Sequence, residues 1–131
     1  MLRFRLVFLL PLLLALTTLH AATLVDPAPI AIPATLGDAQ VSTAVRQALI
    51  GRRWDVTDAQ PGLIKSTLLL RKHKANIEIQ WSAGQLQIRY ISSAKLNYGQ
   101  SNGRRRIHAN YLSWIDNLVA DISRNLTLPI Q

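Results

Sequence analysis

"ANIEIQWSAGQLQIRYI", residues 75–91, alternates between apolar and polar side chains on both sides of a short polar segment. Such a period of two residues is typical of strands with one buried face. The segment 82–85 has room only for a tight turn, and strands joined by a tight turn run antiparallel. This stretch therefore predicts two antiparallel strands whose apolar side chains share one face of a sheet.

Two further strands are predicted on the N-terminal side of this stretch. Residues 63–71 form a long apolar strand, followed by a hairpin connection at 71–74, and residues 54–57 alternate again. Between them, "DAQPG" at 58–62 is predicted to form a turn because it contains Pro61-Gly62. Short connections exclude parallel neighbours, so we expect a four-stranded antiparallel meander.

Helical periodicity appears on both sides of the predicted meander. Apolar residues recur by three and four over 39–50, where Asp38 could cap the helix and Gly51 could end it. A second stripe covers 107–126 and is formed by Ile107, Tyr111, Trp114, Ile115, Leu118, Ile122 and Leu126. The predicted fold is α+β: a helix, a four-stranded antiparallel meander and a helix, with both helices on one sheet face. The alternative is that one helix packs on a partner.

The N-terminal residues have the pattern of a secretory signal peptide. Arg3 and Arg5 precede an uncharged apolar run, and small residues follow at Ala21 and Ala22. We predict a signal peptide over 1–22, a Pro/Ala-rich linker over 23–37 and a single domain over 38–128. The expected location is the periplasm, with no transmembrane span in the mature form. A retained N-terminal membrane anchor is the alternative.

Basic side chains outnumber acidic ones, 15 to 7, and many lie in predicted loops or at element ends. If these ends meet in space, they form a positive patch for anionic lipid or lipopolysaccharide headgroups, or for an acidic envelope protein. Solvated loop charge is the alternative interpretation. Nucleic acid is an unlikely partner in the periplasm, and aromatic residues are not interleaved with the arginines. The hypothetical patch contains Arg52, Arg53, Arg71, Lys72, Lys74, Arg104, Arg105 and Arg106.

No complete catalytic or metal-binding constellation is visible in the sequence. His73 and His108 lack neighbouring ligands at metal-binding spacing, and the chain has no cysteine. No serine lies in a nucleophile-elbow sequence. We therefore expect no metal, no cofactor and no enzymatic activity. A small periplasmic hydrolase whose site assembles only in the fold is the alternative.

The segment "IHANYLSWIDNL", 107–118, gathers several polar and aromatic side chains that could suggest a site. Tyr111 and Trp114 lie on the apolar stripe, so we interpret them as core residues first. His108 and Asn110 open the predicted helix, where side chains commonly satisfy backbone groups. We expect them to hold the predicted loop 93–106 against the helix and so to orient its three arginines.

Several short motifs spread over residues 38–126 together resemble a group of small uncharacterised proteobacterial envelope proteins, many of which look like lipoproteins. The motifs are Gly51–Trp54, Pro61-Gly62, Arg71 with His73 and Ala75, Ile88 with Tyr90, Ser93, Leu96–Tyr98, Ile107-His108, Asn110-Tyr111 and Trp114. The resemblance implies an envelope location and no particular activity. This chain departs from the group because it has no lipobox cysteine, so a lipid tether is not expected. The sequence thus predicts a small exported binding or adaptor protein of the bacterial envelope.

Overall fold

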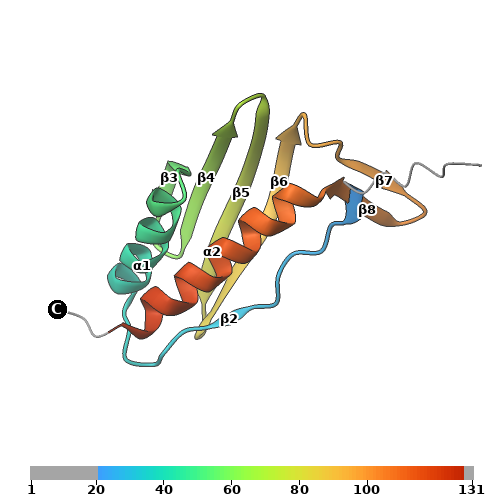
Figure 1. The fold of residues 1–131 in the computed structure, drawn as a ribbon. Coiled ribbons are helices and arrows are strands. Elements are labelled where there is room, and N and C mark those ends of the chain that lie inside the picture. Colours follow the sequence, from blue (N-terminus) through green and yellow to red (C-terminus); the bar gives the residue numbers. More distant parts are fainter. Residues whose placement is uncertain (1–20, 129–131) are drawn as a thin grey trace, which may run out of the picture.

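The computed structural model of the chain describes residues 21–128, which form two helices and eight strands (Figure 1). The strands belong to two separate antiparallel sheets. In chain order the elements are β1 (Ala21–Thr23), β2 (Ile30–Ala31), α1 (Asp38–Gly51), β3 (Asp55–Gln60), β4 (Leu63–Leu70), β5 (His73–Ser82), β6 (Gln85–Ala94), β7 (Gly99–Ser101), β8 (Arg104–His108) and α2 (Ala109–Thr127).

The larger sheet has five strands in the order β2-β6-β5-β4-β3. Its register brings the apolar side chains of neighbouring strands together, because Ile79 of β5 lies opposite both Ile64 of β4 and Ile88 of β6. All three isoleucines are buried. The alternation in the sequence therefore produces one apolar face on this sheet.

Both helices cover this apolar face and pack against each other (Figure 1). Burial of the apolar stripes of the helices against the sheet is the main favourable term for the fold, at roughly 25 cal/mol per Å² of apolar surface. The side chains that the helices bury include Val41, Ala44, Val45, Ala48 and Leu49 of α1, and Tyr111, Ile115, Leu118, Ile122 and Leu126 of α2.

The smaller sheet has three strands in the order β1-β8-β7. Thr23 of β1 lies opposite Arg106 of β8, and Gly99 of β7 lies opposite the same arginine. Asn102 and Gly103 connect β7 to β8, both with positive φ, at 52° and 73°. A two-residue turn with positive φ at both positions matches the twist of a hairpin, and Asn-Gly is its preferred sequence.

The segment 23–37, which contains β2 and a turn at residues 34–35, lies along the domain. Leu24 is buried, and its backbone N–H donates to the Arg105 carbonyl at 2.8 Å. The Asp26 carboxylate accepts a hydrogen bond from the Tyr90 backbone N–H at 2.9 Å. The prolines are compatible with this packing because β2 is only two residues long and contains none.

The predicted fold, with one four-stranded meander between two helices, is wrong. Strands account for 44% of the described residues and helices for 31%, and the strands form two sheets of three and five. Two strands of the second sheet, β7 and the first part of β8, lie within the predicted loop 93–106. Strands of two to five residues are too short to show a periodic pattern, so alternation alone could not reveal them.

Asp38 does not cap α1 as expected. The N-cap residue is Gly37, whose backbone N–H donates to the Gln40 side chain at 2.8 Å. The Asp38 carboxylate instead accepts bonds from the Gly62 backbone N–H at 2.9 Å and the Trp81 indole N–H at 2.8 Å. Asp38 therefore ties the start of α1 to the β3–β4 turn and to the end of β5.

Candidate functional site

A pocket of about 170 Å³ opens where the end of α1 meets the end of β4 and the middle of α2. We call it the indole pocket, because two tryptophans contribute to its wall. Its lining residues are Arg52, Arg53, Trp54, Leu68, Leu69, Leu70, Trp114 and Asn117.

The chain reversal after α1 forms one side of the indole pocket. Gly51 was expected to end the helix in the left-handed conformation, but it lies within α1, and Arg53 takes the positive φ of 65°. The Trp54 backbone N–H then donates to the Leu49 carbonyl at 2.9 Å. This reversal buries the Trp54 indole and leaves Arg53 exposed at the rim.

The other walls of the indole pocket are apolar and partly open to solvent. Leu69 and Leu70 at the end of β4 are 63% and 41% exposed. Trp114 is half-buried and packs against the core from α2. Apolar side chains that remain exposed around a hollow are typical of a binding surface.

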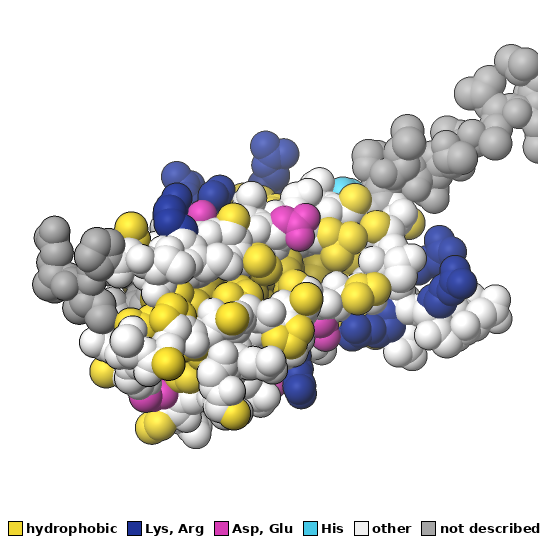
Figure 2. Space-filling view, turned by 90° about the horizontal axis from the view of Figure 1, so that it is seen from below, with side chains coloured by type: hydrophobic (Ala, Val, Ile, Leu, Met, Phe, Trp, Pro, Cys, Tyr) yellow, Lys and Arg dark blue, Asp and Glu magenta, His cyan; other side chains and the backbone are white. Residues whose placement is uncertain are grey.

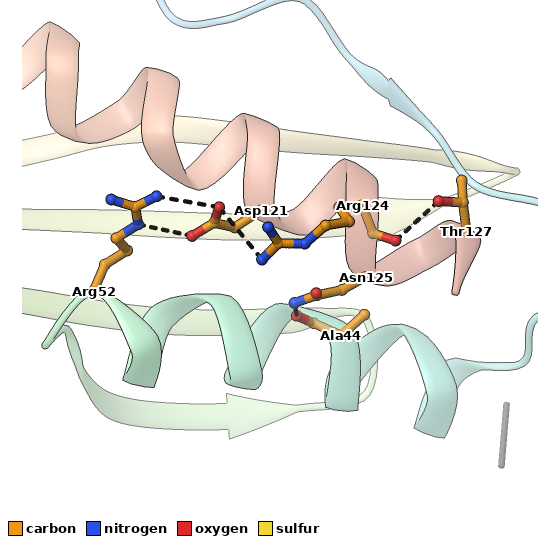
Figure 3. A network of polar contacts seen from close by, with 6 residues as sticks. All are labelled: Ala44, Arg52, Asp121, Arg124, Asn125 and Thr127. Atoms are coloured by element: carbon orange, nitrogen blue, oxygen red, sulfur yellow. Dashed lines mark hydrogen bonds and ion pairs between the residues drawn. The ribbon is translucent and has the colours of Figure 1, made fainter. Parts of the chain in front are cut away.

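The two arginines of the indole pocket differ in their electrostatic surroundings. Arg52 donates to both carboxylate oxygens of Asp121, from Nε at 2.7 Å and from Nη2 at 3.3 Å (Figure 3). These hydrogen bonds and the opposite charges hold the pKa of Asp121 below its ordinary value and raise the pKa of Arg52. Arg53 forms no ion pair within residues 21–128. The uncompensated positive charge at the rim is therefore that of Arg53.

The structure brings His73, His108 and Trp114 together beside this end of the sheet. The ring centroid of His73 lies 6.1 Å from that of His108 and 6.4 Å from that of Trp114. His73 Nδ1 lies 2.7 Å from the Lys95 carbonyl, which can only accept, so this nitrogen carries the proton. His108 Nδ1 accepts from the Asn110 backbone N–H at 3.1 Å. Backbone groups thus engage Nδ1 of both histidines and fix the orientation of each ring.

Residues 93–106 contact the start of α2 through the His108 backbone. The His108 side chain caps α2, while its backbone N–H donates to the Leu96 carbonyl at 2.8 Å. His73 provides a side-chain contact to this region through Lys95. Asn110 contributes its backbone N–H to the cap and is exposed.

The eight basic residues of the predicted patch lie in three parts of the fold. Arg52 and Arg53 follow α1, Arg71 and Lys72 form the β4–β5 turn, with Lys74 just inside β5, and residues 104–106 lie in β8 of the smaller sheet. In Figure 1 the β4–β5 turn and the β7–β8 hairpin project from different places. Figure 2 shows basic side chains in separate groups, one of them over the end of the molecule that carries β7 and β8.

The three consecutive arginines of β8 alternate in direction, as side chains of a strand do. Arg105 is half-buried, and its guanidinium lies 3.6 Å from the Asp26 carboxylate. Arg104 and Arg106 are exposed and form no ion pair in the part of the chain that the structure describes. Only two of the three arginines are therefore available to an external partner.

A cluster of three tyrosines packs near Arg105 and Asp26. The Tyr90 ring stacks on Tyr98 at 4.8 Å between centroids and meets Tyr111 edge-on at 5.6 Å. Burial raises the pKa of Tyr111 and, to a smaller degree, that of Tyr90. Tyr111 is a core residue, as the apolar stripe indicated, and the cluster joins β6 to α2.

Several residues that shape these sites were not recognised in the sequence. Asp121 and Asn117 were given no role from the sequence. Leu69 carried a usable signal, because three consecutive leucines at 68–70 break the alternation and put an apolar side chain on the exposed sheet face. The Asn102-Gly103 pair was a usable signal for the β7–β8 hairpin.

Neither helix of the described chain is long and apolar enough to cross a membrane. No cluster of three or more His, Cys, Asp or Glu side chains suited to a metal ion occurs between residues 21 and 128. The predicted signal peptide lies outside the described residues except for Ala21 and Ala22, which belong to β1. Comparisons with protein-family models, with curated proteins and with solved structures give no match to this chain.

Proposed function

We propose that this protein is a small exported, non-enzymatic binding protein of the bacterial envelope that contacts anionic headgroups through the β7–β8 hairpin. The observation that carries this proposal is a pair of exposed arginines on one strand of the hairpin, Arg104 and Arg106, which form no ion pair among residues 21–128. Guanidinium groups bind phosphate through paired hydrogen bonds, and an anionic surface attracts them over about a Debye length.

The position of β1 supports a membrane-facing role for this hairpin. Thr23 pairs with Arg106, so the predicted export segment joins the domain beside the exposed arginines. If the N-terminal segment were retained as an anchor, the hairpin would therefore lie beside the membrane. A binding role is favoured over hydrolysis because the sequence has no cysteine and no serine in a nucleophile-elbow motif.

Vesicle sedimentation tests the headgroup proposal. We expect the protein to bind vesicles that contain phosphatidylglycerol, and the double variant Arg104→Gln/Arg106→Gln to lose about 2 kcal/mol, or roughly 30-fold in partitioning, at about 1 kcal/mol per arginine. Arg105 is retained, because its loss would remove the ion pair with Asp26. A rise in salt should weaken binding of the parent in the same way.

The matched control is Arg46→Gln/Arg89→Gln, which removes two exposed arginines from α1 and β6. This control should retain most of the binding. Equal loss in both double variants would mean that net charge alone acts, and unchanged binding in the hairpin variant would refute the proposal. N-terminal sequencing of the protein from its host should find a chain that begins at Ala22 or Thr23; an intact Met1 would favour the retained anchor.

A further inference from the structure

The indole pocket has the size of a binding site for one small apolar group. Its volume is about 170 Å³, and an apolar cavity of about 150 Å³ is enough for a benzene ring. Two indoles and three leucines contribute to the lining, so the interior favours a ring or a short branched alkyl group. An occupant would also cover part of Leu69 and Leu70, which are otherwise exposed.

The charge of the side chains at the rim indicates the charge of the occupant. Asp121 neutralises Arg52, whereas Arg53 faces solvent without an ion pair among residues 21–128. No acidic side chain lines the pocket. Asn117 adds an amide that can donate a hydrogen bond. This arrangement attracts an anion and disfavours a cation.

We propose that the indole pocket binds an apolar carboxylate, with its ring or alkyl group between Trp54 and Trp114 and its carboxylate at Arg53 and Asn117. A planar carboxylate fits the guanidinium fork in a bidentate way. The pocket is small beside the 300 Å³ or so of sites for drug-sized ligands, so the apolar part is about one ring. This site is independent of the headgroup surface on β8.

Titration of the full-length chain with 3-phenylpropionate, followed by tryptophan fluorescence and calorimetry, tests the proposal. Two of the three tryptophans of the chain line the pocket, so occupancy should change the emission. We expect saturable binding that is at least tenfold weaker for 3-phenylpropionamide, which keeps the ring and lacks the charge. Equal affinity for acid and amide, or no saturable change at millimolar concentrations, would overturn the proposal.

The variant Arg53→Asn removes the rim charge, and asparagine tolerates the positive φ that Arg53 adopts. It should weaken binding of the acid at least tenfold and leave the amide unaffected. Lys95→Asn is the matched control, because Lys95 is also a cation at positive φ, 62°, and does not line the pocket. If circular dichroism shows that Arg53→Asn does not fold, the comparison of acid and amide on the parent protein still tests whether the pocket binds a carboxylate.

An apolar group next to a carboxylate occurs both in a free acid and at the C-terminus of a peptide. Acetyl-glycyl-phenylalanine presents the ring and a terminal carboxylate, and its C-terminal amide serves as control. Tighter binding of the peptide acid than of 3-phenylpropionate would identify a peptide end as the source. The reverse order would identify a free acid, and failure of both acids to bind would reject the site.

Discussion

The Asp121 carboxylate pairs with two arginines, one that follows α1 and one in α2. Arg52 reaches it from the end of α1, and Arg124 approaches it from the next turn of α2 at 3.7 Å. The Asp121 side chain is only 12% exposed, against 44% for Arg52 and 67% for Arg124. The negative charge of Asp121 is therefore largely buried, and its hydrogen bonds with Arg52 hold that arginine in place at the indole pocket.

The Asp121 network predicts a specific dependence of stability on pH. Its pKa is lower in the folded state than in the unfolded chain, so the folded state binds fewer protons in acid. The stabilisation is complete above the ordinary pKa of aspartate and is lost as the pH falls through the lowered value. Urea unfolding across this range should show a shallower acid limb for Asp121→Asn. An acid limb identical to that of the parent would mean that Asp121 titrates normally.

The β7–β8 hairpin shows that a short strand can be recognised from its turn residues when it is too short for a periodic pattern. Helix α1 and the strands β4, β5 and β6 were predictable because each repeats its pattern over eight or more residues. β7 has three residues, so only the Asn102-Gly103 turn marks it. The pocket was less predictable still, because Trp54, Leu69 and Trp114 meet only after the sheet and both helices have packed.

Two glycines should respond in opposite directions to the same substitution. Gly103 has a φ of 73°, where alanine is strained, so Gly103→Ala should cost about 1 kcal/mol. Gly51 lies in α1, and a Cβ there would meet no atom within 4 Å. Gly51→Ala should therefore stabilise the protein by about 0.5–1 kcal/mol. Chemical denaturation of both variants measures this, and two effects of the same sign would contradict the assigned backbone conformations.

At the scale of the whole molecule, the N-terminal segment belongs to the folded unit. Pairing of β1 with β8 joins residues that are more than eighty positions apart, and no local pattern encodes such a contact. The three prolines of 23–37 made a linker the reasonable prediction from composition. Tertiary contacts such as those of Leu24 and Asp26 hold this segment against the domain.

Leu24 and Val25 provide a direct test of this packing. Leu24 is 3% exposed and Val25 is 68% exposed, although they are neighbours. Leu24→Ala should cost about 2–5 kcal/mol, as for other buried leucines, whereas Val25→Ala should stay within about 0.5 kcal/mol of the parent. Urea denaturation of both variants distinguishes the cases. A freely moving linker would make both substitutions neutral.

The β1–β8 pairing also sets an order of events for the growing chain. Residues 21–23 are synthesised early, yet their partners at 106–108 appear only when α2 is about to follow. The smaller sheet therefore cannot close until most of the chain has left the ribosome, and contacts of such long sequence separation form slowly. Until then the residues of the first strand remain an unpaired edge of the growing chain.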